Sequence, residues 1–280
     1  DRQICCRAIP QVEWSKHLRK VQYKDYNLNR RFIQAQSASF GLFLDGILAE
    51  NKAMELVNSV SDQVPLYVFS GIIRNFLLGY LNNRDVDFVA VDTFKVNIPL
   101  SLLRKVSLRK NKFNGYKLVS NNLTIDWWDI ERTWGILQEG MKGTVYSLLN
   151  TAFFNFSAIA YDYNKRRFLI SEEFCKFYST HTMEIVYAKN PWIDTCIINA
   201  LYYADNYEFT IGNSLRKWIV KNYRENLDFE RAQLNRYQKV IYSNEIIHAF
   251  AIICSRSDIY NKRIIRLCGG RKEIELKFDV

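Results

Sequence analysis

The segment Tyr67–Gly79 reads YVFSGIIRNFLLG, and RDVDFV follows at residues 84–89. The apolar run at residues 66–69 predicts a buried strand, and Ser70-Gly71 predicts a tight exit from that strand. Residues 72–80 then predict a short helix that ends at its glycine, and a second strand follows. We expect this strand, turn, helix and strand to decide the fold of the whole chain.

Two aspartates stand two residues apart on the second predicted strand. Asp85 and Asp87 therefore point to one face of the sheet, whereas Val86 and Phe88 point to the other, into the core. Neighbouring carboxylates repel unless a cation lies between them, and Mg²⁺ binds through carboxylates together with substrate phosphates. The Ser70-Gly71 turn lets backbone N–H groups approach a phosphate. The pattern predicts metal-assisted phosphoryl or nucleotidyl transfer, although an Asp-x-Asp pair also occurs on strands that only face solvent.

The order small-Gly-x-x-Arg-x-x-Leu-Leu-Gly, followed by Asp-x-Asp, resembles the head domain of the DNA polymerase β superfamily of nucleotidyltransferases. The resemblance is greatest to CCA-adding tRNA nucleotidyltransferases and bacterial poly(A) polymerases, whose first motif reads Gly-Gly-x-Val-Arg-Asp. The matching positions here are Ser70, Gly71, Ile73, Arg74 and Asn75, so that an asparagine replaces the usual acid. The resemblance covers roughly residues 64–225.

A third acid is expected on a neighbouring strand. Residues 116–119 and 123–130 predict two strands joined by a turn, and the second contains Asp126. The resemblance places a third catalytic carboxylate beside the Asp-x-Asp strand, where Asp126 stands. It implies that Asp85, Asp87 and Asp126 hold Mg²⁺ or Mn²⁺ and that Asp126 accepts the proton of an attacking hydroxyl. The implied nucleotide contacts are Ser70, Gly71 and Arg74. A plain surface acid is the alternative for Asp126.

Two departures from the family pattern concern the nucleotide. Residues 157–161 (SAIAY) match the end of the family's next motif, but Thr151-Ala152-Phe153 replaces its Arg-Arg-Asp. Losing an arginine removes a bidentate phosphate partner. The expected neck helix at residues 191–204 has no base-reading arginines. The corresponding positions hold Cys196, Asn199 and Tyr202.

We expect an α+β fold in three parts. Residues 1–63 form an N-terminal arm and a helix that packs on the head, residues 64–170 form a nucleotidyltransferase head with a small mixed β-sheet and flanking helices, and residues 171–280 form an all-α neck and body. The helical pattern of residues 37–60 is expected to kink near Gly46.

The last part of the body is expected to contain three further helices. These span residues 228–242, 244–254 and 258–268, and a charged strand or tail follows at residues 272–279. The three histidines of the chain, His17, His181 and His248, have no metal-ligand spacing.

Composition favours a polyanionic partner in a reducing compartment. The net charge is +10, and residues 216–280 carry 14 Lys or Arg against 8 Asp or Glu, with aromatic residues between them. Basic residues among stacking rings suit RNA, although solvated faces of amphipathic helices give the same pattern. The six cysteines show no Cys-x-x-Cys spacing. No secretory signal or apolar run of about 18 residues is present, so we expect a cytoplasmic protein without a membrane span.

The sequence therefore predicts a divalent-metal-dependent nucleotidyltransferase. It would transfer a nucleoside monophosphate from a nucleoside triphosphate to the 3′ hydroxyl of an RNA such as tRNA, which the basic C-terminal half would bind. Two alternatives remain. The same chemistry could act on a protein or small-molecule hydroxyl, or the fold could serve as a non-catalytic module that binds RNA or a partner.

Overall fold

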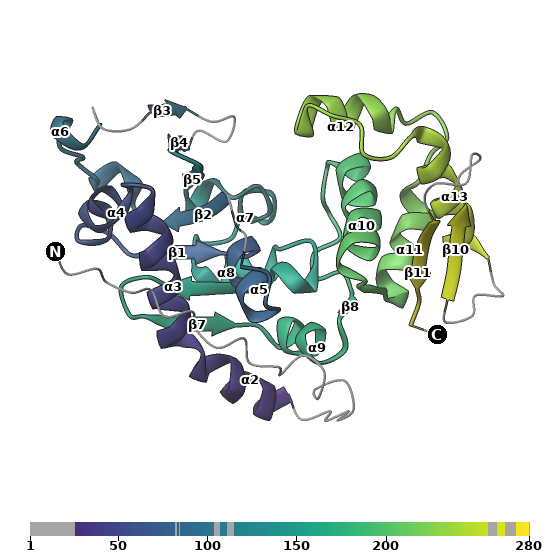
Figure 1. The fold of residues 1–280 in the computed structure, drawn as a ribbon, viewed down its shortest axis with the longest axis horizontal. Helices are drawn as coiled ribbons and strands as arrows, with labels where there is room; N and C mark the ends of the chain where they lie inside the picture. Colours follow the sequence, from purple (N-terminus) through teal and green to yellow (C-terminus); the bar gives the residue numbers. More distant parts are fainter. Residues whose placement is uncertain are drawn as a thin grey trace, which may run out of the picture.

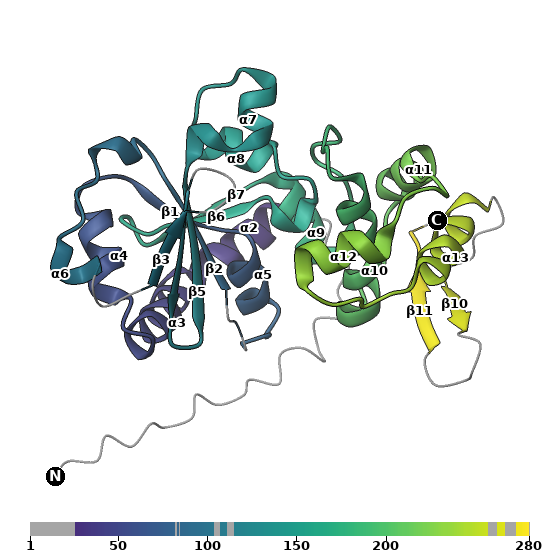
Figure 2. The ribbon, with the colours of Figure 1, turned by 90° about the horizontal axis from the view of Figure 1, so that it is seen from above.

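The computed structural model describes residues 26–81, 83, 85–103, 107–110, 115–256, 262–266 and 273–279. These residues form two lobes that lie side by side (Figures 1 and 2). The first lobe contains a β-sheet with helices on both faces. The second contains the later helices and a short β-hairpin.

A seven-stranded mixed sheet forms the centre of the first lobe, in the order β3-β4-β5-β2-β1-β6-β7. Only β2 and β5 are parallel, and every other neighbouring pair is antiparallel. The predicted strands before and after the Ser-Gly turn are thus confirmed as β1 and β2, which lie at the middle of the sheet. The strands are β1 (Leu66–Phe69), β2 (Asp85–Ala90), β3 (Ser107–Lys110), β4 (Tyr116–Ser120), β5 (Leu123–Asp129), β6 (Ile159–Asp162) and β7 (Arg167–Ile170).

Strand alternation divides the sheet into two faces. Val68, Phe88 and Ile125 point to one face and join the main hydrophobic core, which is covered by α3 (Ser37–Glu50), α4 (Met54–Ser61) and α5 (Gly71–Leu77). The opposite face is partly covered by α7 (Trp134–Glu139) and α8 (Val145–Asn150). This second face also carries Asp87, because its side chain alternates with that of Phe88. The remaining head helices are α2 (Tyr26–Ala35), α6 (Leu100–Leu103) and the 3₁₀ turns η2 (Thr93–Lys95), η3 (Ile130–Arg132) and η4 (Asn155–Ser157).

The helical pattern of residues 37–60 forms two helices rather than one helix kinked at Gly46. Gly46 lies inside α3, whereas the break occurs at residues 51–53, where Lys52 has a φ of 56°. The side chain of Asn51 donates to the Ile47 carbonyl and ends the helix. Ala53 then lies fully buried, so the break turns α4 back onto the sheet.

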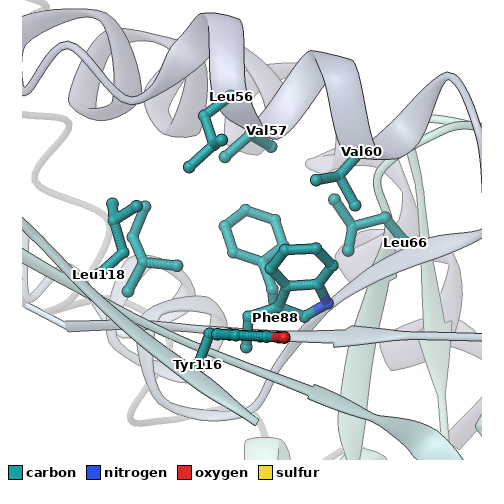
Figure 3. A pocket seen from close by; sticks show the side chains of 9 residues that line it. Leu56, Val57, Val60, Leu66, Phe88, Tyr116 and Leu118 are labelled. Atoms are coloured by element: carbon teal, nitrogen blue, oxygen red, sulfur yellow. The ribbon is translucent and has the colours of Figure 1, made fainter. Parts of the chain in front are cut away.

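A cavity of about 20 Å³ lies between α4 and the sheet (Figure 3). Its walls are apolar side chains, including Val57, Val60 and Phe88. Trp127 also lines it, and among the described residues its indole N–H has no hydrogen-bond partner. A void of this size can hold about one water molecule. It is therefore too small to hold a nucleotide or another substrate.

The second lobe is largely helical but not all-α. Its helices are α9 (Glu172–Thr180), α10 (Ile193–Tyr207), α11 (Asn213–Asn222), α12 (Phe229–Tyr237) and α13 (Asn244–Ser255). Strands β8 (Thr182–Met183) and β9 (Thr210–Ile211) pair with each other, and β10 (Lys262–Arg266) pairs with β11 (Glu273–Lys277).

The expected helix at residues 258–268 is therefore wrong for its described part, which is β10. Ile274 and Leu276 of β11 are buried, whereas Glu275 between them is exposed. This period of two is typical of a half-buried strand, and β11 provides the partner that makes β10 a strand. Among the described helices, none is both long enough and apolar enough for a membrane crossing.

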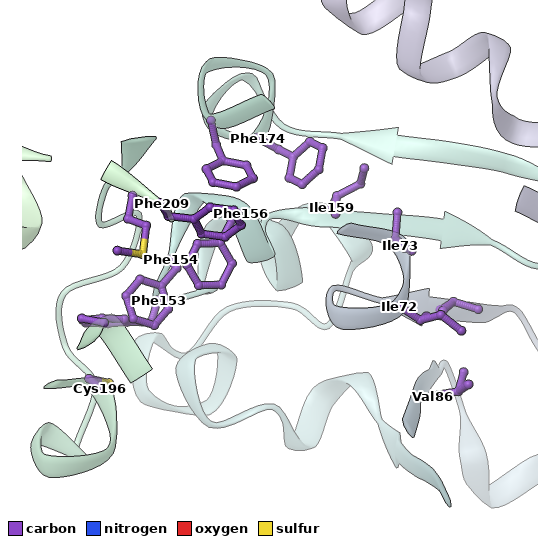
Figure 4. Close-up of a cluster of buried hydrophobic side chains, with 14 of the residues drawn as sticks. Ile72, Ile73, Val86, Phe153, Phe154, Phe156, Ile159, Phe174, Cys196 and Phe209 are labelled. Atoms are coloured by element: carbon purple, nitrogen blue, oxygen red, sulfur yellow. The ribbon is translucent and has the colours of Figure 1, made fainter. Parts of the chain in front are cut away.

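One hydrophobic core joins the two lobes. Figure 4 shows Ile72 and Ile73 of α5, the phenylalanines of residues 153–156 and Phe209 beside β9 within one buried cluster. Phe156 contacts both Tyr203 of α10 and Phe209, with ring centroids 4.5 Å and 5.8 Å apart. Helix α10 of the second lobe therefore packs directly against η4, which in turn contacts α5.

Candidate active site

The Ser70-Gly71 turn joins β1 to α5 and has an unusual backbone. Ser70 has a φ of 56° and a ψ of −99°, a left-handed conformation that L side chains rarely adopt. Its N–H donates to the Ile159 carbonyl of β6 at 3.1 Å, which fixes the turn against the sheet. A Cβ added at Gly71 would meet no heavy atom within 4 Å. The backbone at Gly71 is therefore open to a ligand.

Strand register brings two of the predicted acids side by side. Asp87 of β2 pairs with Asp126 of the parallel strand β5 and, on its other side, with Phe69 of β1. Residues directly opposite on neighbouring strands share a face. Because Phe69 immediately precedes Ser70, the acids and the turn occupy the same end of the sheet. Asp85 is two residues from Asp87 and shares its face.

The Asp87 carboxyl group has a strongly perturbed pKa. Burial, together with the neighbouring charges of Asp126 and Asp85, raises this pKa to about 7, against the opposing charge of Lys117. Each carboxylate that approaches Asp87 disfavours its charged form. The three predicted acids thus repel one another, and a cation bound between them would relieve this repulsion.

Lys117 is a site residue that sequence reasoning missed. It lies on β4, opposite Asp126 in the register, and its Nζ is 3.2 Å from the Asp126 Oδ2. The signal that could have found it is the antiparallel pairing of residues 116–120 with 123–127 across the predicted turn. That pairing makes Lys117 the direct neighbour of Asp126 on the face of the acids.

The donor chemistry of the site suits a hard divalent cation. Asp85, Asp87 and Asp126 offer only oxygen atoms, as Mg²⁺ and Mn²⁺ prefer. Among the residues that the structure describes, however, no group of three His, Cys, Asp or Glu side chains is gathered closely enough to hold a metal ion. Asp126 is instead paired with Lys117. The ligand types fit, and the side chains would have to adjust to close around a cation.

Arg74 is buried in a cage of aromatic rings. Its side chain belongs to α5, is only 4% exposed, and places its guanidinium carbon 4.7 Å from the ring centroid of Tyr203 and 5.1 Å from that of Phe156. The guanidinium also donates to Asn75 Oδ1 through Nε and Nη2, at 3.1 Å and 2.8 Å. Asn75 thus occupies the place of the family's acid and serves as the acceptor. This setting supports a bracing role for Arg74 more directly than a phosphate contact.

The segment that replaces the family's Arg-Arg-Asp is apolar and buried. Ala152 and Phe153 belong to the core, and the Phe153 ring packs 4.8 Å from that of Trp218 on α11. The Thr151 hydroxyl donates to the Ser147 carbonyl. None of these three side chains offers a cation to a triphosphate.

Helix α10 likewise carries uncharged groups where the family reads the base. Cys196 is buried, and burial raises the pKa of its thiol to about 12. The Asn199 side chain accepts a hydrogen bond from the Tyr237 hydroxyl at 2.6 Å, and Tyr202 packs against the core. These side chains connect α10 to its neighbours.

Comparison with solved structures identifies the fold. An apo form of a CCA-adding enzyme aligns with a TM-score of 0.52 and 18% identity, and the match covers 75% of this chain and 54% of that structure. A CCA-adding enzyme in complex with ATP aligns with a TM-score of 0.50 and 17% identity, with the same two shares, 75% and 54%. No protein-family model matches the chain, and no curated protein matches it.

These likenesses confirm the expected fold, which over the aligned part of the chain is that of CCA-adding enzymes. The chain spans about half the length of the two structures, since 54% of each is covered. At 17–18% identity, these two likenesses establish the fold but not the reaction.

Proposed function

We propose that this chain, whose head has the fold of CCA-adding enzymes, is a nucleotidyltransferase dependent on Mg²⁺ or Mn²⁺. It transfers a nucleoside monophosphate from a nucleoside triphosphate to an RNA 3′ hydroxyl, with tRNA as the foremost acceptor to test. The observation that carries the proposal is the pairing of Asp87 with Asp126 across parallel strands, next to the Ser70-Gly71 turn. Two interacting carboxylates beside an open backbone turn suit a metal-bound triphosphate.

The three acids would share the metal, and Asp126 has a second part in this reaction. Asp85, Asp87 and Asp126 would hold the cation, which supplies charge neutralisation at the phosphates when it is bound. The RNA 3′ oxygen attacks the α-phosphorus, its proton passes to the Asp126 carboxylate, and the bond to the departing pyrophosphate breaks. The departing phosphates are contacted by the backbone N–H of Gly71 and by the hydroxyl group of Ser70, whose own N–H is bonded to the Ile159 carbonyl. Arg74 keeps the helix behind the turn in place.

RNA is proposed to bind through the basic second lobe. Exposed cations include Lys217 and Lys221 on α11 and Arg231 and Arg236 on α12. Arg216 of α11 instead serves the fold, since it donates to the Cys254 carbonyl at 3.1 Å. Contacts from such exposed cations to phosphates make binding strongly dependent on salt.

A non-catalytic RNA-binding or partner-binding module is the second candidate. Two observations favour it. Buried Phe153 stands within the segment that replaces Arg-Arg-Asp, and the Lys117 ammonium group lies where it neutralises Asp126 without a metal. The same catalytic chemistry on a protein or small-molecule hydroxyl is the third.

Transfer of labelled nucleotide separates these functions. The protein is incubated with each labelled nucleoside triphosphate, Mg²⁺ or Mn²⁺ and bulk tRNA, and the products are resolved by size. We expect label in tRNA for the native chain and at least a hundredfold loss for the Asp85→Ala, Asp87→Ala variant, because the metal ligands are removed.

Asp62→Asn provides the matched control, since Asp62 is an exposed acid of the same lobe outside the site. Circular dichroism checks that each variant is folded. Label in protein rather than tRNA would favour the third function. Salt-sensitive RNA binding without any transfer would reject the proposed activity in favour of the binding module.

A further inference from the structure

A row of charged side chains crosses the sheet at the level of the acids. In register, Arg109 of β3 pairs with Lys117 of β4, Lys117 pairs with Asp126 of β5, and Asp126 pairs with Asp87 of β2. Four directly opposed residues share one face. Two cations therefore lie next to two acids along a single line. The change from positive to negative charge occurs between Lys117 and Asp126.

Lys117 is placed to compete for one of the acids. Strand β5 lies between β4 and β2, so Asp126 has an ammonium donor on one side and the Asp87 carboxylate on the other. The distance of 3.2 Å between the Lys117 and Asp126 side chains is that of a direct ion pair. A divalent cation shared by Asp87 and Asp126 needs the same carboxylate oxygens.

The ion pair is also easy to open. The Lys117 side chain is 44% exposed and that of Asp126 is 27% exposed. Exposed pairs of this kind are weak, because water screens the charges and two side chains must be held in one geometry. A cation of charge +2 can therefore displace the ammonium group, and the cost of doing so lowers the apparent metal affinity.

The influence of Lys117 extends beyond its direct partner. Its positive charge lies in register with Asp126 and one strand removed from Asp87, where it opposes the repulsion between the two carboxylates. It thus supplies, in the metal-free protein, part of the neutralisation that a cation would supply. This explains how the acids can remain together before metal binds.

We infer that Lys117 is a positioning residue that holds Asp126 in the metal-free protein and must release it for a divalent cation to bind. The inference rests on the proposed metal-dependent function. Lys117 thereby sets the metal concentration at which the site becomes complete. The structure assigns it no contact with the reacting atoms.

Binding of Mn²⁺ alone to the full chain tests this role without any reaction. Free Mn²⁺ is measured by electron paramagnetic resonance during titration of the native protein and of Lys117→Met, Lys117→Arg and Asp87→Asn. We expect Lys117→Met to bind Mn²⁺ about tenfold more tightly than the native chain, because a competing charge a few ångströms away is removed. Lys117→Arg keeps the charge and should bind as the native chain does, and Asp87→Asn should lose the site.

Lys95→Met is the matched control. Lys95 lies in the same lobe, is 56% exposed and pairs with Asp92 at 2.5 Å, so its removal changes the net charge equally but leaves the site alone. Its Mn²⁺ affinity should stay within about twofold of the native value.

The outcomes distinguish the two proposals. Equal or weaker Mn²⁺ binding by Lys117→Met, with a native site that depends on Asp87, overturns the role of Lys117 and leaves the metal-dependent function standing. The absence of any Asp87-dependent Mn²⁺ binding in both the native chain and Lys117→Met overturns the metal-dependent function, and the inference fails with it.

Discussion

Asp87 lies where three charged side chains act on one partly buried carboxyl group. Its pKa is raised to about 7 in the folded protein, whereas an aspartate in an unfolded chain titrates near 3.9. Between these values the folded state binds a proton that the unfolded state has lost. The free energy of unfolding of the metal-free protein therefore falls as pH rises from about 4 to about 7, and this loss is complete above pH 7.

Asp87→Asn removes this titration and should reverse the loss. At pH 8 the variant should exceed the native chain by about 1–4 kcal/mol in free energy of unfolding, with the lower values expected because the group is only partly buried. The difference should shrink as pH falls towards 4. Urea unfolding in the presence of a chelator measures it. A difference that is constant with pH would contradict the raised pKa.

Ser70 holds a backbone conformation suited to glycine, which is the residue of the family motif at this place. Its φ of 56° and ψ of −99° cost a non-glycine residue about 1–3 kcal/mol. Ser70→Gly should therefore raise the free energy of unfolding by about 1 kcal/mol, since the strain removed exceeds the added chain entropy.

Ser59→Gly is the control for this substitution, because Ser59 lies inside α4. There the same change should lower stability by about 0.5 kcal/mol through helix propensity alone. Chemical denaturation compares the two variants. A loss of stability in Ser70→Gly would show that the serine side chain, rather than the strained backbone, dominates at this turn.

The residues of the site differ in how far sequence could predict them. Ser70, Gly71, Asp85 and Asp87 follow from local spacing, because strand alternation alone places both acids on one face. Lys117 was not predicted, because it becomes the neighbour of Asp126 only when β4 pairs with β5. The aromatic surroundings of Arg74 could not be predicted either, since two of the three rings belong to α10, far along the chain.

At the scale of elements, Arg74 connects α5 to α10. Its guanidinium lies over Phe156 of η4 and over Tyr203 and Tyr207 of α10, at 4.7–5.5 Å. Buried cation–π contacts contribute about 2 kcal/mol or more, and the bonds to Asn75 add to this. The helix that follows the turn is thereby fixed to the first long helix of the second lobe.

Arg74→Met should accordingly cost about 2–4 kcal/mol in free energy of unfolding, as the charge and its hydrogen bonds are lost while most of the volume remains. Arg166→Met is the control. Arg166 also lies over a ring, that of Tyr163 at 4.7 Å, but its side chain is 44% exposed, so its loss should cost less than about 1 kcal/mol. If urea unfolding shows the same loss of unfolding free energy for both variants, the aromatic cage of Arg74 adds no stability beyond that of an exposed cation–π contact.

Sequence patterns predicted some elements well and others poorly, for physical reasons. Strands β1, β2, β4 and β5 carry strong alternation or apolar runs between turn residues and lie within a residue or two of expectation. The local sequence of β10 predicts a helix instead, because Ile264-Ile265 among basic residues fits either period over so short a run. Its partner β11 decides the outcome, and pairing between segments is not a property of local sequence.

At the scale of the molecule, the two lobes share one core, and this bears on how the site is kept in shape. The rings of Phe154, Phe156 and Phe209 continue the packing of the head into the second lobe. Interiors are close-packed, so such a junction resists independent movement of its two sides.

The central strand also has a consequence for biosynthesis. Strand β1 pairs with β2 on one side and with β6 on the other, although β6 comprises Ile159–Asp162 and is made much later. During synthesis, the edge of β1 that pairs with β6 therefore remains unpaired until β6 has left the ribosomal exit tunnel. An unpaired strand edge invites association with other chains. Nascent chains that terminate before residue 159 should consequently need chaperone protection rather than yield a smaller folded head.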